Sequence, residues 1–255
     1  MFDLAFRFVA RKFAIPLLQF LRRPLLARTM RAASRLLGVR TPPPRGAFET
    51  ALEWAAQPGG DGRKYVEIYP ASEVRRQPPR SIHEDLPSVF REALLHANPS
   101  VFLATVPGGR VLGRYGSVIS GDDFLLGDLS HEWFFKPAQH PLRFRFSLPE
   151  PKVLRGISAT LASPSGWNYF HWLLNALPRA GILEKAGWDL GAIDWFILNE
   201  GDARYHEETL DGLGIVKEKR LRVGRGSHFR CAQLLAPSLP ADVPAETPEI
   251  GRAHV

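Results

Sequence analysis

Residues 153–198 decide the fold, and they read VLRGISATLASPSGWNYFHWLLNALPRAGILEKAGWDLGAIDWFIL. Short apolar runs alternate, in this stretch and after it, with stretches whose apolar residues recur three and four apart. The predicted strands are residues 153–161, 193–198, 220–223 and 232–236, and the predicted helices between them are residues 167–186 and 205–213. Strands that alternate with helices form a parallel sheet with helices on its faces. We therefore predict a Rossmann-like α/β half over residues 151–240.

Residues 48–150 have a different pattern. Their short apolar runs are separated by turn residues such as Pro107-Gly108-Gly109 and Gly121-Asp122-Asp123, which is typical of a small sheet. The predicted strands are residues 65–69, 101–106, 111–112, 117–119 and 124–126, and the segment from Ser88 to His96 is predicted as a short helix. The sequence therefore predicts a strand-rich lead-in ahead of the parallel sheet, and an α/β fold class for the whole chain.

Length and composition restrict the class of protein. The chain has 255 residues, of which 45% are hydrophobic and 23% charged, which is typical of one or two globular domains. The one cysteine, Cys231, cannot form an internal disulfide. Residues 1–45 contain ten Lys or Arg and one acid, so the net charge of +7 belongs to this end and the remainder carries −2. The globular body therefore has no basic surplus that would favour nucleic acid as a partner.

Residues 1–40 are predicted to form a basic, amphipathic helical tail that ends at a Pro-rich linker, residues 41–47. No charge-free run in the tail approaches the ~20 apolar residues that span a bilayer. Arg28, Arg31 and Arg35 are predicted to share one face. This pattern favours a helix in the interface of an anionic membrane through residues 1–38, and a cytoplasmic protein peripheral to the membrane. A helix docked on the body and an organelle transit peptide are the alternatives.

Residues 241–255 are predicted to be a linker followed by an artefact. Four prolines lie between Pro237 and Pro248, which is typical of a linker. The last seven residues can be back-translated to a common sequencing adapter, so we expect the natural protein to continue beyond about Pro248. The chain is then expected to be the N-terminal portion of a longer protein.

Several common catalytic motifs are missing from the sequence. It contains no GxxxxGK[ST], HExxH or GxSxG pattern, and no cysteine and histidine cluster with metal-ligand spacing. Asp122 and Asp123 are adjacent after a glycine, so we expect solvated turn residues that point apart rather than metal ligands. No cofactor and no metal are predicted.

The segment from Ser165 to Arg179 carries the most information about function, and Ser165 is its expected N-cap. A single helix over this segment has an apolar face, expected to pack on the sheet, made of Phe170, Leu173, Leu174 and Leu177. It also has a polar stripe, made of Asn168, His171, Asn175 and Arg179. Asn and His are poor helix formers, so we interpret the stripe as hydrogen-bonding groups, for a ligand or for buried polar groups. Pro178 is expected to kink or restart the helix.

The run Asn168-Tyr169-Phe170-His171-Trp172-Leu173-Leu174-Asn175-Ala176-Leu177-Pro178-Arg179 resembles the Asn-Tyr-x-His-Trp…Leu-Pro-Arg segment of the family 61 glycosyltransferases, which include bacterial members linked to capsular polysaccharide synthesis. The lead-in, from Val101 through Asp128-Leu129-Ser130, resembles the same proteins. The resemblance covers residues 100–240 and implies the first half of a two-Rossmann-domain glycosyltransferase, with a nucleotide-sugar donor and inversion at the anomeric carbon. The family often has an acid where this chain has Asn175, and its donor-linked second half has no counterpart here.

Inverting transfer needs a base for the acceptor hydroxyl, and His171 is the candidate for this base or for positioning the acceptor, because imidazoles titrate near neutral pH. The candidate substrate-binding residues are Asn168 and Asn175, to orient sugar hydroxyls or the imidazole, Tyr169 or Trp172, to stack on a sugar ring, and Arg179. The expected partners are a nucleotide sugar and a glycan acceptor, and a chain without the donor half is expected to be inactive. The alternative function is a non-catalytic, membrane-associated module that binds a glycan or a protein.

Overall fold

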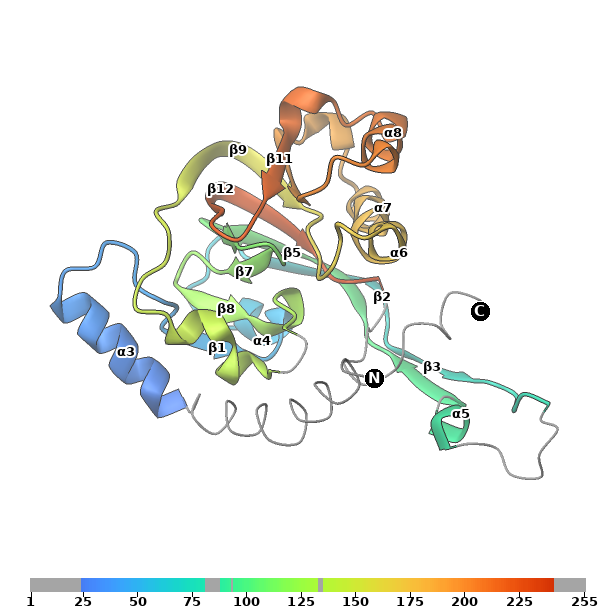
Figure 1. Ribbon diagram of the computed structural model, residues 1–255, viewed down its shortest axis with the longest axis horizontal. Coiled ribbons are helices and arrows are strands. Elements are labelled where there is room, and N and C mark those ends of the chain that lie inside the picture. The colour runs from blue at the N-terminus through green and yellow to red at the C-terminus, as the bar shows by residue number, and fades with distance from the viewer. Residues whose placement is uncertain (1–23, 81–87, 93, 133–134, 241–255) are drawn as a thin grey trace, which may run out of the picture.

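The computed structural model of the protein describes residues 24–80, 88–92, 94–132 and 135–240. Within these residues, ten strands form one mixed sheet (Figure 1). They are β1 (Gly46–Phe48), β2 (Lys64–Tyr69), β5 (Val101–Pro107), β6 (Arg110–Leu112), β7 (Ser117–Ile119), β8 (Phe124–Leu126), β9 (Lys152–Thr160), β10 (Trp195–Asn199), β11 (Arg220–Val223) and β12 (His228–Pro237). The strands β3 (Ser72–Arg75) and β4 (Leu95–Asn98) form a separate antiparallel ribbon.

Strand β12 joins the two parts of the sheet. On one side it is parallel to β9, and β10 and β11 continue in the same direction. On its other side, the first half of β12 is antiparallel to β6 and the second half to β5. Leu235 thus lies opposite Ala159 of β9 and Thr105 of β5. The predicted α/β class is confirmed, and strands from residues 48–150 and 151–240 share one sheet.

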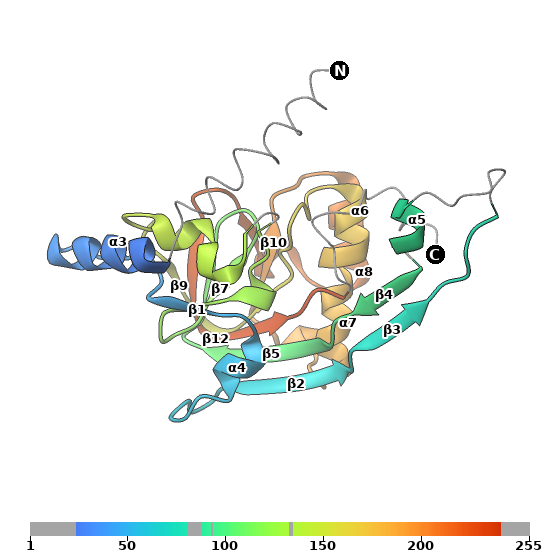
Figure 2. The same cartoon turned by 90° about the horizontal axis from the view of Figure 1, so that it is seen from below.

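The described helices are α3 (Pro24–Leu36), α4 (Ala51–Ala55), α5 (Ser88–Glu92), α6 (Tyr169–His171), α7 (Pro178–Lys185) and α8 (Arg204–Gly212). Helices α6, α7 and α8 lie next to one another beside the sheet, as Figures 1 and 2 show. Successive side chains of a strand point to opposite faces, and β12 follows this rule. Leu234 packs in a core cluster with Trp54 of α4, whereas Leu235 packs in a second cluster with Leu183 of α7. Both faces of the sheet are therefore covered.

The predicted helix from Ser88 to His96 is correct only in its first half. Helix α5 ends at Glu92, and His96 belongs to β4, where it lies opposite Val74 of β3. The ribbon of β3 and β4 extends away from the body together with α5 (Figure 1). Strand pairing with β3 therefore overrides the local helical pattern of this segment.

The predicted single helix over residues 167–186 is wrong. Ser165 has a positive φ of 57° and lies in a turn, so it is not the N-cap. Asn168 takes that position, and its side chain accepts the backbone N–H of Phe170 at 2.9 Å. After α6, residues 172–176 form a π-helical turn in which the Leu177 N–H donates to the Trp172 carbonyl at 2.8 Å. Helix α7 then begins at Pro178, as the expected restart requires.

The π-helical turn also changes which side chains face the sheet. A π-turn spans one residue more than an α-turn, so the residues after it are rotated relative to the predicted faces. Leu174 is consequently 45% exposed, whereas Trp172 and Ala176 are fully buried. Leu173 and Leu177 pack partly against the core, so the predicted apolar face is correct only in part.

Helix α3 is docked on the body, which was one of the alternatives for this part of the tail. Arg31 is buried, where it donates to the Pro43 carbonyl and forms an ion pair with Asp123, a partner that Arg110 shares. The predicted face of Arg28, Arg31 and Arg35 is therefore not wholly exposed, because Arg31 is buried whereas the other two are exposed. None of the helices in the described part of the chain is long and apolar enough to cross a membrane. The predicted tail residues 1–23 lie outside the described residues.

The prediction that Asp122 and Asp123 point apart is confirmed, but the prediction that they are solvated is wrong. Asp122 accepts the indole N–H of Trp54 at 3.0 Å and pairs with Arg63 at 3.0 Å. Asp123 instead forms an ion pair with Arg31 of α3. This turn therefore anchors α3 and α4 to the sheet.

Candidate functional site

A small cavity lies at the carboxyl ends of β9 and β12, with about 200 Å³ of empty space that is partly open to solvent. The chain runs from β9 to β10 and β11 on one side and then returns as β12 on the other side of β9. Ligands of parallel α/β sheets bind where the strand order reverses in this way. The cavity is lined by Tyr115, Asp128, Leu129, His131, Ala162, Pro164, Arg179 and Leu239.

Close contacts fix the loops that form this cavity. The Asn199 side chain accepts the N–H of Ser163 and donates to the carbonyls of Ser163 and Arg114, each at 2.9 Å. It thus holds the loop after β9 against the turn between β6 and β7. In that turn Gly116 has a φ of 70°, and a Cβ added there would lie 2.6 Å from the Cβ of Ala162. Only glycine lets the turn approach so closely.

Arg179, in the first turn of α7, contributes a buried cation to the cavity. Its Nε donates to the Pro237 carbonyl at 3.0 Å, Nη2 donates to the same carbonyl, and Nη1 donates to the Ala162 carbonyl. Two of the five guanidinium N–H groups are not used by these bonds. No acidic side chain of the described residues pairs with Arg179, and burial lowers its pKa to about 9. The site therefore holds a positive charge without a counter-ion from the described chain.

Asp128, directly after β8, contributes a carboxyl group to the same cavity. Each of its carboxylate oxygens lies 2.9 Å from the backbone nitrogen of Ala51, at the start of α4. Desolvation raises the pKa of Asp128 to about 7, and the negative charge of Glu53 acts in the same direction. A carboxyl group with this pKa can take up or release a proton at neutral pH.

An aromatic pair stands beside these groups. The rings of Tyr115 and Trp167 stack with their centroids 5.8 Å apart, and the guanidinium carbon of Arg114 lies 3.8 Å from the centroid of Trp167. Tyr115 lines the cavity, so the cavity has an aromatic wall as well as charged groups. Apolar ring faces of this kind suit the C–H faces of a ligand, while polar groups fix its orientation.

Of the residues predicted for the site, Arg179 alone lines this cavity. His171 is 3% exposed, and its Nδ1 lies 2.9 Å from Oδ1 of Asn175, which is buried as well. Trp172 is buried and donates its indole N–H to Thr209 of α8 at 2.9 Å. The structure thus brings His171 and Asn175 together in the interior, and neither residue lines the cavity.

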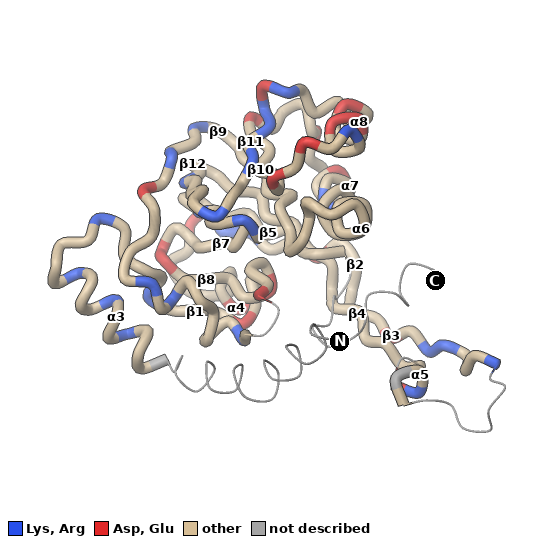
Figure 3. The backbone as a smooth tube through the Cα atoms, viewed as in Figure 1, with Lys and Arg blue, Asp and Glu red and all other residues tan. Residues whose placement is uncertain are grey.

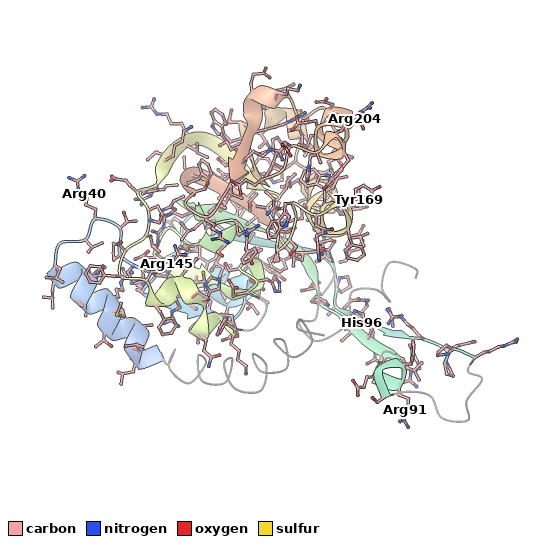
Figure 4. The ribbon with its side chains drawn as sticks, viewed as in Figure 1. Arg40, Arg91, His96, Arg145, Tyr169 and Arg204 are labelled. Carbon is pink, nitrogen blue, oxygen red and sulfur yellow. The ribbon has the colours of Figure 1, made fainter. Side chains whose placement is uncertain are left out.

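Asn168 and Tyr169 are exposed at the start of α6. The Asn168 side chain is used as the helix cap. Tyr169 is 58% exposed, and its ring packs edge-on against Tyr205 at a centroid distance of 4.9 Å. Figure 4 shows Tyr169 at the outer surface of the protein. The substrate-binding roles of these two residues remain predictions.

Sequence reasoning did not identify Asp128, His131 or Tyr115 as site residues. Asp128 was noticed only within the resembling run Asp128-Leu129-Ser130, which is a weak signal. Its placement depends on Ala51, 77 residues earlier in the chain, and a contact over that separation leaves no local pattern. The predicted stripe included Arg179 on the assumption of one continuous helix, and Arg179 lines the cavity although that helix is interrupted by the π-helical turn.

The described residues contain no group of three or more His, Cys, Asp or Glu side chains that could hold a metal ion. In the comparisons with known proteins, no family model, no curated protein and no solved structure matches the chain. The cavity and its groups are therefore the basis for assigning a function.

Proposed function

We propose that the protein is a glycosyltransferase that transfers a sugar, with inversion, from a nucleotide-sugar donor to a glycan or polysaccharide acceptor. One observation carries this proposal: a carboxyl group with a pKa near 7 and a buried arginine share a cavity at the carboxyl ends of parallel strands. The strand order β11-β10-β9-β12 supports a Rossmann-like half. The resemblance of residues 168–179 to the family 61 segment supports the reaction class.

In this proposal the cavity holds the acceptor, and Asp128 is the general base. The acceptor hydroxyl gives its proton to the Asp128 carboxylate while its oxygen attacks the anomeric carbon and the nucleoside diphosphate leaves. Asp128 is favoured over His171 because it lines the cavity, whereas His171 is buried against Asn175. His171 is then a positioning residue, because its contact with Asn175 holds the helical segment that leads to Arg179. Tyr115, whose ring stacks on Trp167, would lie beside the sugar in this cavity.

The proposal is tested with the protein expressed from its complete reading frame. A screen of nucleotide sugars should reveal donor hydrolysis, and acceptor glycans should increase the release of nucleoside diphosphate. Asp128→Asn should remove this turnover, whereas Glu73→Gln, an exposed site on β3, should not. A folded protein that binds glycans but releases no diphosphate from any donor would contradict the proposal. That result would favour the alternative, a non-catalytic binding module.

We also propose that α3 lies on an anionic membrane surface, as expected for a peripheral protein on the cytoplasmic side. Its small and polar residues Ala27, Arg31 and Ser34 face the body, whereas Leu25 and Leu36 are 74% and 87% exposed. The apolar face of this helix therefore points away from the core. Figure 3 shows basic residues and no acidic ones along α3, which suits anionic lipid headgroups.

A further inference from the structure

We propose that the cavity binds the anionic group, a carboxylate or a phosphate, of an acidic sugar, and that Arg179 is the cation that receives it. This inference rests on the proposed function and names the class of acceptor. It makes the acceptor a charged glycan, such as one that contains uronic acid or sugar phosphate units, rather than a neutral one.

The first argument is the unbalanced charge of Arg179. The side chain is 3% exposed, and its hydrogen-bond partners among the described residues are the carbonyls of Ala162 and Pro237. Carbonyl oxygens satisfy N–H groups but provide no negative charge. Burying a cation costs several kcal/mol unless an anion is close to it. A charged ligand group in the cavity would supply that anion.

The second argument is geometric. A guanidinium presents its N–H groups as a planar fork that matches the two oxygens of a carboxylate or phosphate. The bonds of Arg179 to Pro237 and Ala162 fix the plane of this fork. Leu129, Pro164 and Leu239 give the cavity apolar walls, and an ion pair is stronger where water is excluded.

The third argument is the size of the cavity. The space of about 200 Å³ includes open solvent, so the enclosed part is far below the ~300–1,000 Å³ typical of pockets that enclose a whole small molecule. It therefore suits one group of a larger substrate. With the anionic group at Arg179, a neighbouring hydroxyl of the same sugar would lie toward Asp128, which lines the same cavity.

A role of Arg179 as a structural clamp is the competing explanation, because its bonds join the ends of β9 and β12. A clamp does not distinguish charged from neutral sugars, so ligand binding separates the two. We would titrate the 255-residue chain with methyl β-D-glucuronide, glucose 1-phosphate and, as the neutral control, methyl β-D-glucoside. At least one acidic probe should bind ten-fold or more tightly than the glucoside, and the probe that binds identifies the anionic group.

Two variants should each lower this binding by at least ten-fold. Arg179→Gln removes the cation, and Leu239→Trp fills the half-buried rim of the cavity while Arg179 stays in place. Leu239→Trp keeps the test decisive if Arg179→Gln fails to fold. The matched controls are Arg204→Gln on the exposed side of α8 and the half-exposed Val216→Trp, and both should bind as the wild type does.

Equal affinity for charged and neutral sugars would overturn the inference, and so would undiminished binding by the folded Leu239→Trp variant. Because these titrations need no donor and no turnover, their outcome is separate from the proposed function. If the protein is an active transferase that accepts only neutral glycans, the inference of an acidic acceptor is wrong and the proposed transferase activity is supported. Specific binding of an acidic sugar without any transfer would support the acidic ligand and contradict the transferase.

Discussion

The two carboxylate oxygens of Asp128 lie 2.9 Å from the backbone nitrogen of Ala51, so one peptide N–H of α4 serves a carboxyl group that borders a cavity. Carboxylates that accept two or three N–H groups are strongly stabilised in their charged form. For Asp128, desolvation outweighs the backbone N–H groups of Ala51, Asp128 and Leu129, which act in the opposite direction, and raises the pKa to about 7. The protein therefore keeps a carboxyl group whose charged form is disfavoured, which is typical of a functional residue.

The pKa of Asp128 predicts a stabilising substitution. Because this pKa rises from 3.8 to about 7 on folding, the folded state binds more protons between these values, and stability falls as pH increases through this window. The associated loss above pH 7 is at most about 4 kcal/mol. Asp128→Asn carries no charge and should therefore raise the free energy of unfolding at pH 8 by ~1–3 kcal/mol. Urea unfolding at pH 4 and pH 8 measures this difference.

At pH 4, wild type and Asp128→Asn should have nearly equal free energies of unfolding, because the native carboxyl group is then protonated. Glu73→Gln, a similar change at an exposed position of β3, should have no effect at either pH. If Asp128→Asn is less stable than the wild type at pH 8, the carboxylate is not disfavoured in the folded protein and the argument fails.

Activity separates Asp128 from His171. If Asp128 is the base, Asp128→Asn should lower turnover by ~10²–10⁴-fold, and the rate of the wild type should fall as pH decreases below about 7. His171→Ala should lower turnover by two or more decades only if His171 is the base. Because His171 contacts Asn175 outside the cavity, we expect a smaller loss and an unchanged acid limb in the pH–rate profile. Disappearance of that limb in His171→Ala would restore His171 as the base.

Local patterns predicted most of the strands. The predictions for residues 117–119, 124–126 and 220–223 agree with β7, β8 and β11. Short apolar or alternating runs between turn residues have few alternative structures, and these runs are bounded by glycine, serine or charged residues. Strand β12 extends beyond its predicted range, from His228 to Pro237, because it pairs with β6, β5 and β9. Pairing of this kind depends on distant segments, so the sequence of the strand alone does not determine where the strand begins and ends.

The site was harder to predict than the strands. The spacing of Asn168, His171 and Asn175 assumes 3.6 residues per turn, and the π-helical turn after His171 breaks that assumption. One additional residue in a turn leaves no compositional mark, so the sequence did not predict it. Asp128 belongs to the site only because α4, far away in the sequence, covers it.

Two leucines of the same segment test the corrected helix faces. Leu174 is 45% exposed in the π-helical turn, whereas Leu183 of α7 is fully buried in the core. Leu183→Ala should lower the free energy of unfolding by ~2–5 kcal/mol because it leaves a cavity. Leu174→Ala should change it by no more than about 1 kcal/mol. Comparable losses in chemical denaturation would mean that both side chains face the core and that the predicted single helix was correct.

The exposed leucines of α3 provide a test of the proposed membrane contact. The double variant Leu25→Glu/Leu36→Glu should lower recovery with anionic vesicles in flotation by at least ten-fold, because it places two acids on the exposed apolar face. Leu52→Glu is the matched control, since Leu52 is 53% exposed on α4, and it should float as the wild type does. A chain without residues 1–38 should lose vesicle binding. Equal flotation of all these proteins would show that α3 is not a membrane contact.

Buried histidine predicts a loss of stability in mild acid. His206 is 1% exposed, and its ring lies 4.5 Å from that of Trp172. Desolvation, assisted by the positive charge of Arg222, lowers its pKa from 6.5. The unfolded state therefore binds more protons below pH 6.5, and the stability that His206 provides above this pH is lost as pH falls through its folded pKa.

The Tm of His206→Leu should therefore fall less between pH 7.5 and pH 5 than the Tm of the wild type. Any packing cost of the substitution is the same at both pH values, so it does not affect this comparison. His228 contributes in the same direction, since burial lowers its pKa as well, so the variant should reduce the decrease without abolishing it. His96→Gln, on the half-exposed strand β4, should leave the decrease unchanged. An identical decrease in wild type and His206→Leu would mean that the imidazole is protonated inside the fold, which requires an acceptor near its ring.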